Sequence, residues 1–486
     1  MTRPPVRSIS NLVPNIISGK EVASAKLQIP VLSPNAPYET LHHYTSFPVS
    51  PESISELSSI VQSGFKTWSN TSETERIKIF TRAIELLQQR RHELIESQLE
   101  IGMPMWFAGF NVDGFIGQVQ EYINMLGNSS STSIIPSAET DLAMAVRSPI
   151  GPVLSISPWN APVLLAGRSI MAPLAAGCSV IVKPAEKSPK CAYLLVKCFL
   201  DAGVPGNVLQ LVNVKPQENA VFIDKLLGTG VIRKLNFTGS TLVGKSIAAT
   251  AGSHLVPCLL ELGGKNASIV CPDADIDQAV GKITWSGWSH KGQICMSTDV
   301  AYIHESVYDE FKSKLVTVAR EIAQDPDYLI PQRDLVGTTK VVNLIEDALN
   351  KGASLTFGEF SKQEIESSGI IKPIILENVI KGMELYDQES FGPVFSIEKY
   401  SNINQVIDKI NHSPYGLKSA IWSRNVFEAI KLAKQIETGG VHINNSTVHD
   451  EPTVPHGGLK SSGIGRFNSR WGIDDFTVVK SITVNQ

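Results

Sequence analysis

Cysteine is scarce in this chain, and its spacing argues against two common roles. The 486 residues include six cysteines, and no two of them are spaced as CxxC. So few thiols in so long a chain do not form a disulfide framework, and without CxxC pairs the usual zinc and redox motifs are missing. We therefore expect a reducing compartment, the cytoplasm, in which a cysteine remains a free thiol.

The sequence also lacks a basic excess, a metal-ligand cluster and a long uninterrupted apolar run. A net charge of −4 and a pI of about 6.2 argue against nucleic acid as a partner. The ten histidines form no HExxH motif and no Cys/His ligand set, so no metal site is expected. Prolines and Arg168 interrupt the most apolar stretch, residues 150–182, which predicts buried strands and a helix and no membrane span.

The first 20 residues carry basic side chains but no acidic residue and no apolar segment. A secretory signal needs an apolar segment. Mitochondrial import therefore stays as the weaker alternative to the cytoplasm.

From residue 149 onward, short apolar segments alternate with helical segments. Strands are expected at 153–156, 179–182, 208–212, 232–237 and 256–260, and then at 267–270, 300–303, 372–376, 394–399, 418–422 and 440–444. This alternation predicts an α/β fold with a parallel, doubly wound sheet and a second α/β domain. A chain of 486 residues is long enough for two or three domains.

The two ends of the chain follow other patterns. Residues 1–50 are rich in Pro, Ser and Asn and are expected to be irregular and extended. Ser72 and Glu75 form a capping-box pattern that predicts the start of a long helix, and a second helix is expected over roughly 105–127. The tail 475–484 alternates weakly and predicts an added strand.

A thiol and a carboxylate stand in glycine-flanked segments. Cys295 lies in Gly-Gln-Ile-Cys-Met-Ser-Thr, and Glu261 lies in Leu-Glu-Leu-Gly-Gly-Lys at the end of an expected strand. A thiol can act as a nucleophile, and a carboxylate so placed can act as a general base. Taken singly, Cys295 is better explained as a buried apolar side chain, and Glu261 as a surface or ion-paired residue.

Small and charged residues follow two more of the expected strands. Gly239, Ser240 and Gly244 lie where a strand ends and a helix begins, which would let a phosphate approach the helix N-terminus. A plain tight turn explains them as well. Lys183 and Glu186 follow another strand, where a carboxylate can accept hydrogen bonds from a ribose and would repel a 2′-phosphate. A solvated turn is equally consistent.

An amide and an indole follow the strand at 153–156. Asn160 offers a donor for a developing oxyanion. A turn or helix-capping role is nevertheless the commoner one for an Asn in this position. Trp159 beside it is more often a core residue than the wall of a ligand site.

The order of these segments resembles the NAD(P)-dependent aldehyde dehydrogenase superfamily over essentially the whole chain. The matching segments are SPWNAP (157–162), KPAE (183–186), FTGSTLVG (237–244), LELGGK (260–265), GQICMS (292–297), ESFGPV (389–394) and PHGGLKSSGIGR (455–466). The resemblance implies that Cys295 is the nucleophile and Glu261 the general base. It also implies that Asn160 and the backbone N–H of Cys295 form the oxyanion hole.

The same resemblance implies a site for NAD, with NADP as a second possibility. Lys183 and Glu186 would hold the adenosine ribose, and Trp159 would line the cleft. Ser240, in the turn with Gly239 and Gly244, would hold a phosphate. Glu389 and Phe391 would position the nicotinamide ribose and ring.

The implied fold is aldehyde dehydrogenase-like and has three parts. A Rossmann-like NAD-binding domain would comprise residues 1–128 and 148–258, and a catalytic domain residues 259–450. A small β element, 129–147 and 470–486, would join subunits into a homodimer or homotetramer.

Three positions depart from the commoner family pattern. Phe467 follows Gly-Ile-Gly-Arg where many members have Glu, which weakens a two-carboxylate relay and leaves Glu261 as the main base. Arg168 replaces the Trp of a Trp-Lys pair, and His456 replaces the Phe of Pro-Phe-Gly-Gly. The last two positions are expected near the aldehyde tunnel.

These departures are similar to the salicylaldehyde and vanillin dehydrogenase group, which implies an aromatic aldehyde as substrate. Arg168 lies eight residues after Asn160, near the same helical face. It could bond a ring hydroxyl or methoxy group, and a structural ion pair is the alternative. Ile294 and Met296 would give an apolar wall beside Cys295.

Other interpretations stay open at this point. A general aliphatic or semialdehyde dehydrogenase is the main alternative, and a non-catalytic binding or structural protein on this fold is a remote one. Trp106, Phe107 and Phe110, on the second expected helix, are as readily a core stripe as part of the tunnel.

Overall fold

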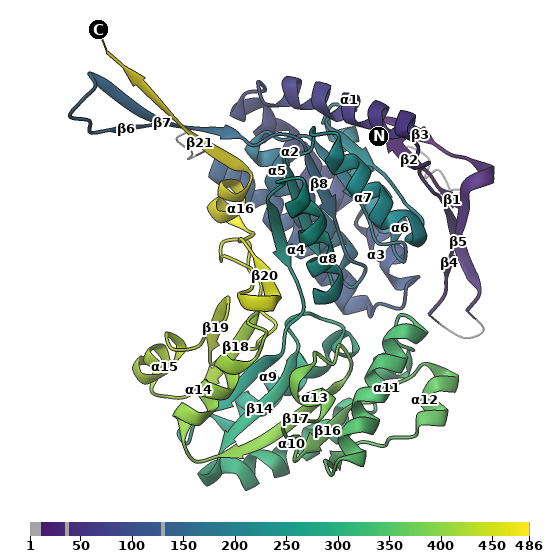
Figure 1. The fold of residues 1–486 in the computed structure, drawn as a ribbon. Helices are drawn as coiled ribbons and strands as arrows, with labels where there is room; N and C mark the ends of the chain where they lie inside the picture. Colours follow the sequence, from purple (N-terminus) through teal and green to yellow (C-terminus); the bar gives the residue numbers. More distant parts are fainter. Residues whose placement is uncertain (1–10, 35–37, 128–131, 486) are drawn as a thin grey trace.

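Two large β-sheets and two small ones organise the chain (Figure 1). The computed structural model describes residues 11–34, 38–127 and 132–485. One body is built around an eight-stranded sheet and the other around a seven-stranded sheet, and a three-stranded sheet projects from the first body. Within the described ranges, none of the helices is long and apolar enough to cross a membrane.

The first body contains the predicted doubly wound sheet. In spatial order its strands are β20 (Gly463–Ile464), β12 (Cys258–Glu261), β11 (Lys234–Thr238), β8 (Val153–Ile156), β9 (Val180–Lys183), β10 (Leu209–Leu211), β2 (Asn15–Ile17) and β3 (Lys20–Val22). The five strands from β12 to β10 are parallel. The chain runs outward from β8 to β10 and then returns to β11, so the strand order reverses between β8 and β11. Ligands bind at such a reversal, beyond the carboxyl ends of the strands.

Helices cover both faces of this sheet (Figure 1). They are α1 (Pro51–Trp68), α2 (Glu73–Gln89), α3 (Arg91–Leu99), α4 (Met105–Gly127), α5 (Pro162–Ala176), α6 (Pro189–Ala202), α7 (Asn219–Gly228) and α8 (Thr241–Ser253). The predicted start of α2 is confirmed, because the Ser72 side chain accepts a hydrogen bond from the backbone N–H of Glu75. The apolar α5 is buried along its whole length and packs against α4 and α6.

The expectation of an irregular N-terminal segment is wrong for much of its length. Besides β2 and β3, it forms β1 (Leu12–Val13), β4 (Gln28–Leu32) and β5 (Thr40–Thr45), which make a small sheet of their own. Strand β2 pairs with β10, nearly 200 residues later in the chain, through Ile16 and Leu211. A strand of three residues is too short to show a clear alternation of apolar and polar side chains, so no local pattern in the sequence indicates this pairing.

The second body contains the other predicted α/β unit. Its strands, in spatial order, are β15 (Ser354–Phe357), β16 (Ile374–Glu377), β17 (Val394–Tyr400), β14 (Thr298–His304), β13 (Asn266–Val270), β18 (Lys418–Trp422) and β19 (Gly440–Ile443). Its helices are α9 (Ile276–Trp288), α10 (Tyr308–Ile322), α11 (Leu335–Asn350), α12 (Lys362–Ser368), α13 (Glu384–Asp387), α14 (Ile403–His412) and α15 (Val426–Ala433). All strand pairs are parallel except β15 with β16.

The boundary between the bodies differs slightly from the expected one at residue 259. Strand β12 pairs with β11, so Glu261 at its end belongs to the first sheet, and the second sheet begins at Asn266. The chain also returns to the first sheet through β20, which pairs with β12. Two segments therefore connect the bodies, and both pass beside Glu261.

The projecting sheet consists of β6 (Thr132–Ile135), β7 (Leu142–Pro149) and β21 (Thr477–Val484), with β7 in the middle. It leaves the first body after the short α16 (Ser469–Asp475), and most of its side chains are exposed or half-buried (Figure 1). The expected tail strand is confirmed. The expected bridging element coincides with this sheet, apart from residues 129–131 and 486, which lie outside the described residues.

Candidate functional site

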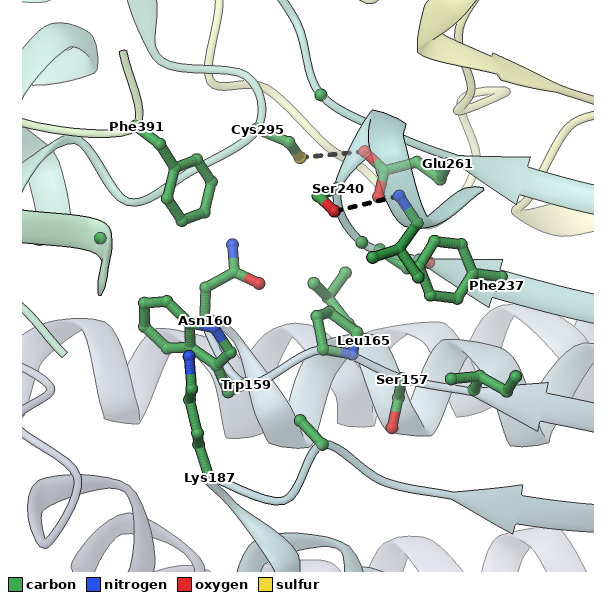
Figure 2. Close-up of a pocket in the computed structure, with 18 of the residues that line it drawn as sticks. Ser157, Trp159, Asn160, Leu165, Lys187, Phe237, Ser240, Glu261, Cys295 and Phe391 are labelled. Carbon is green, nitrogen blue, oxygen red and sulfur yellow. Dashed lines mark hydrogen bonds between the residues drawn. The ribbon is translucent and has the colours of Figure 1, made fainter. Parts of the chain in front are cut away.

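A cavity of about 590 Å³ lies at the carboxyl ends of β8, β9 and β11, where the strand order reverses. Ten residues singled out in the sequence line it, and Figure 2 shows several of them around one space: Trp159, Asn160, Lys183, Glu186, Gly239, Ser240, Glu261, Cys295, Glu389 and Phe391. They come from both bodies and from positions up to 232 residues apart. The structure thus brings together side chains that the sequence could place only in order.

One half of the cavity fits a dinucleotide. Ser240 is the N-cap of α8 and accepts a hydrogen bond from the Val243 N–H at 3.4 Å. A Cβ on Gly239 would lie 2.5 Å from the Phe237 ring, so only glycine fits this turn. The helix N-terminus therefore opens onto the cavity with small residues around it, which suits a phosphate. Gly244 does not line the cavity, because it lies against Leu262, where a Cβ would be 2.4 Å away.

Lys183 and Glu186 lie at the end of β9, on the same side of the cavity. The Lys183 ammonium donates to the Pro184 carbonyl at 3.1 Å, and burial lowers its pKa. Glu186 is half-buried, and its carboxylate interacts with the Lys183 ammonium. A lysine and a carboxylate so placed fit the hydroxyl groups of a ribose.

Phe391 comes from the second body and faces Trp159 (Figure 2), and Glu389 of the same body also lines the cavity. Phe391 has a φ of 53°, and its ring meets the Trp159 ring edge-on at 6.1 Å between centroids. Glu389 accepts a hydrogen bond from the Gly264 N–H at 3.1 Å, and burial raises its pKa to about 7. Both aromatic rings line the cavity, where they give the flat ring of a nicotinamide an apolar surface.

The thiol and the carboxylate are in direct contact. Cys295 Sγ donates a hydrogen bond to Glu261 Oε1 at 2.9 Å (Figure 2). Burial raises the pKa of the Cys295 thiol well above its ordinary value, and the charge of Glu261 raises it further. The resting thiol is therefore protonated, and its proton already points at a base.

Glu261 is 0% exposed, yet it remains ionised. Burial alone would raise the pKa of its carboxyl, but interactions with His456, Arg168 and the Cys295 thiol hold that pKa below its ordinary value. Glu261 is thus a buried carboxylate whose Oε1 accepts a hydrogen bond from the Cys295 thiol. That arrangement suits a general base.

Asn160 lies below the thiol. Its amide nitrogen donates to the Gln293 carbonyl at 3.0 Å, and that nitrogen is directed toward the space between Phe391 and Cys295 (Figure 2). An amide nitrogen carries two N–H groups, so one hydrogen bond leaves a second donor for an oxyanion.

The loop that carries Cys295 is held by close backbone contacts. Asn266 Nδ2 donates to the carbonyls of Cys295 and Ser297 at 2.9 and 2.8 Å. A Cβ on Gly264 would lie 2.8 Å from the Cys295 carbonyl oxygen, which explains a glycine there. Gly292 has a φ of 70°, and its Cβ would lie 2.0 Å from the Gly392 carbonyl oxygen. These contacts fix the thiol relative to Glu261.

Arg168 is placed differently from the expected substrate contact. Its side chain is 1% exposed, does not line the cavity, and pairs with Asp450 at 2.7 Å and with Glu261 at 3.8 Å. Its guanidinium also lies over the Phe467 ring, 4.7 Å from the centroid. The ion-pair alternative accounts for this position.

Ile294 and Met296 also do not line the cavity. Both are buried in the apolar cluster that contains Phe107 and Phe467, and Cys295 packs against this cluster. The environment of the thiol outside the cavity is therefore apolar, as the sequence indicated.

Sequence reasoning missed several residues of the site. Lys187, Asp334 and Lys340 line the cavity, and Lys187 forms an ion pair with Asp334 that joins the two bodies. Asp334 caps α11 by accepting from the Gly337 N–H at 2.9 Å, a position that no strand pattern marks. Asp450 was also missed, since only its place in the fold brings it beside Arg168.

No metal site accompanies these residues. Within the described part of the chain, no group of three or more His, Cys, Asp and Glu side chains could hold a metal ion. The six cysteines there are free thiols.

Comparisons with known proteins agree with the geometry of this site. The model of the "Aldehyde dehydrogenase family" matches residues 22–482. A salicylaldehyde dehydrogenase of Pseudomonas putida is 36% identical over 430 residues, which cover 87% of this chain and 88% of that protein. A vanillin dehydrogenase of Pseudomonas fluorescens is 37% identical over 429 residues, with 87% and 88% covered.

Among solved structures, a salicylaldehyde dehydrogenase from Pseudomonas putida G7 complexed with salicylaldehyde superposes with a TM-score of 0.92. It is 33% identical in sequence, and 98% of each chain is covered. The family match spans nearly the whole chain, and both relatives exceed a third identity over most of their length. The chain belongs to the aldehyde dehydrogenase family.

Proposed function

We propose that this protein oxidises an aromatic aldehyde, of the salicylaldehyde, vanillin or benzaldehyde type, to its carboxylic acid with NAD as hydride acceptor. The observation that carries the proposal is the similarity, over most of the chain, to a salicylaldehyde and a vanillin dehydrogenase. The apolar surroundings of Cys295 support it, because an aromatic ring needs an apolar pocket.

A run of aromatic rings in contact also supports an aromatic substrate. Trp106 is 44% exposed and contacts Phe107, which stacks on His290 at 4.9 Å between centroids. His290 meets Trp159 at 6.3 Å, and Trp159 in turn meets Phe391. Rings in contact therefore lead from the exterior to Trp159 and Phe391, whose surfaces line the cavity. Such surfaces bind another aromatic ring favourably.

The proposed reaction uses atoms whose positions support it. As Cys295 Sγ attacks the aldehyde carbon, its proton passes to Glu261 Oε1, which already accepts it at 2.9 Å. The amide of Asn160 and the backbone N–H of Cys295 stabilise the oxyanion. A bound nicotinamide cofactor supplies the hydride acceptor for the oxidation. After that proton has left Glu261, its carboxylate takes a proton from the water that hydrolyses the thioester on Cys295.

A panel of aldehydes tests the substrate class. Initial rates of NADH formation are measured with salicylaldehyde, vanillin, benzaldehyde, hexanal and succinic semialdehyde. We expect kcat/KM for the best aromatic aldehyde to exceed that for hexanal by about tenfold or more, the scale of an apolar pocket's discrimination. Faster oxidation of hexanal than of every aromatic aldehyde would contradict the proposal. Cofactor binding without turnover of any aldehyde would favour a binding protein.

The NAD preference is proposed from Glu186 in the cavity. A carboxylate there would repel a 2′-phosphate, so NAD is expected to be the better cofactor. Glu186→Gln removes the charge at nearly constant size and should shift the NADP-to-NAD ratio of kcat/KM toward NADP by roughly tenfold or more. The exposed Glu56 on α1 gives a matched control, Glu56→Gln, that should leave the ratio unchanged. An unshifted ratio in Glu186→Gln would mean that Glu186 does not face the ribose.

The projecting sheet and the free thiols support two smaller proposals. We propose that this sheet joins subunits into a homodimer or homotetramer, since its edge strands β6 and β21 expose Ile134 and Val479. We also propose a reducing compartment, the cytoplasm, because Cys295 must stay a thiol to react.

A further inference from the structure

A buried imidazole touches the carboxylate that the reaction uses, although no step above needs it. The His456 side chain is 1% exposed, and its Nε2 lies 3.6 Å from Glu261 Oε1. On the other side, its Nδ1 lies 3.6 Å from Asp450 Oδ1. Neither nitrogen has a hydrogen-bond partner among the described residues. Buried polar atoms are seldom left in this state without a functional reason.

Asp450 fixes the orientation of this ring. Its carboxylate accepts from Arg168 at 2.7 Å and from Asn468 Nδ2 at 2.7 Å. Although burial opposes it, the nearby His456, Arg168 and Lys418 lower the pKa of Asp450 to about 2, so it is ionised. Both ring nitrogens thus lie 3.6 Å from a carboxylate oxygen, and the tautomer with its hydrogen on Nδ1, toward Asp450, turns the lone pair of Nε2 toward Glu261.

The imidazole is ready to receive a proton. Burial lowers the pKa of His456, with Arg168 and Lys418 acting in the same direction and Asp450 and Glu261 against it, so the ring is neutral at pH 7. The half-buried His442 also lies nearby, and burial lowers its pKa to about 3. The separation of 3.6 Å is longer than a hydrogen bond, but catalytic contacts tighten when substrate binds.

The position of His456 relates two of the departures noted in the sequence. His456 and Phe467 form a backbone bridge, with the His456 N–H 3.2 Å from the Phe467 carbonyl and the Phe467 N–H 2.7 Å from the His456 carbonyl. Phe467, at the position where many members of the family carry a second carboxylate, places its ring under the Arg168 guanidinium. The segment paired with it carries an imidazole in contact with Glu261.

We propose that His456, held by Asp450, is a positioning residue that receives from Glu261 the proton of the Cys295 thiol, and so restores the Glu261 carboxylate before hydrolysis. This step rests on the proposed function. The Sγ–H bond breaks as the S–C bond to the aldehyde forms, and the proton moves through Oε1 to Nε2. Glu261 then takes one proton from water and returns it to the departing Sγ. The imidazolium releases the first proton to solvent after the acid leaves.

The test uses the full-length enzyme and its best aldehyde. His456→Gln keeps a polar side chain that cannot accept this proton, and His456→Phe installs the residue that is common in the family pattern. NADH formation is followed by stopped flow at several pH values, with and without hydroxylamine. Hydroxylamine cleaves a thioester without a general base. Thermal midpoints and the dissociation constant for NAD are measured alongside.

We expect the first turnover of both variants to keep its rate and amplitude, because Glu261 starts as a carboxylate. The steady rate that follows should fall about 10²-fold or more, the scale of general-base catalysis. Hydroxylamine should restore it. A structural role alone produces neither the burst nor the rescue.

His442→Gln is the matched control, since it removes a neighbouring imidazole that does not contact Glu261, and its rates should stay within about twofold. A wild-type steady rate in His456→Gln would overturn the proposal. So would an equal loss of both phases with a lower thermal midpoint, which would assign His456 to folding. If the wild-type enzyme prefers aliphatic aldehydes, the substrate proposal fails, and the same test proceeds with the preferred aldehyde.

Discussion

Cys295→Ala should abolish aldehyde oxidation, with kcat lowered by roughly 10⁴-fold or more, as when a covalent nucleophile is removed from other enzymes. The physical reason is that no other thiol contacts Glu261: its described partners are Cys295, Arg168 and His456. Alanine also removes the group that forms the thioester. NADH formation at saturating aldehyde measures the loss, and NAD binding should change by no more than about twofold, because the proposed phosphate and adenosine-ribose contacts lie on the other body.

Cys258→Ala is the matched control for this prediction. Cys258 is half-buried like Cys295, and it begins the strand β12 that ends at Glu261. Its replacement therefore tests the loss of a thiol near the site that takes no part in the proposed reaction. Its activity should match the wild type. Residual oxidation by Cys295→Ala at more than a small fraction of the wild-type rate would show that another group attacks the aldehyde.

Glu261→Gln should slow both halves of the reaction. The steady rate is expected to fall about 10²- to 10⁴-fold, because general-base assistance to water is lost. The first turnover should also slow at neutral pH, because the Cys295 thiol, with its raised pKa, gives its proton to Glu261. As pH rises toward the thiol pKa, free thiolate forms without a base, so the first turnover should recover while the steady rate stays low. Stopped-flow measurement of the NADH burst follows both phases.

A second buried carboxylate provides the control. Glu121 on α4 is 8% exposed and accepts a hydrogen bond from Ser469 outside the cavity, so Glu121→Gln tests the loss of a buried charge alone. Its burst should be unchanged. A full-rate burst in Glu261→Gln at neutral pH would show that the thiol loses its proton to another group, and that Glu261 serves hydrolysis only.

The sequence predicted much of this fold because its elements have strong local patterns. The strand expected at 418–422 is β18, and the helix expected over 105–127 is α4. Helical and strand periodicities lie within such segments, so neighbouring residues suffice to identify them. The small strands β1 to β5 were missed, since strands of two to six residues show no clear alternation.

The residues of the candidate site also fall into those that the sequence predicts and those that only the fold places. Residues that follow strands, such as Asn160 and Ser240, could be placed at the edge of a parallel sheet from sequence alone. The partners of Glu261 could not. Arg168 lies 282 residues before Asp450 in the chain. Only packing brings Arg168, Asp450 and His456 within 4 Å of one another or of Glu261. The expectation that Arg168 meets the substrate followed from its helical position alone, which says nothing about the acid that neutralises it.

Strand β12 ends in the first body, whereas the thiol it activates lies on a loop of the second. During synthesis the base therefore emerges first and the nucleophile later, and Asp450 and His456 emerge near the end. A nascent chain that has reached Cys295 but not yet closed the two bodies holds a thiol with no proton acceptor beside it. Its thiol gains the Glu261 carboxylate as a proton acceptor only when the two bodies close.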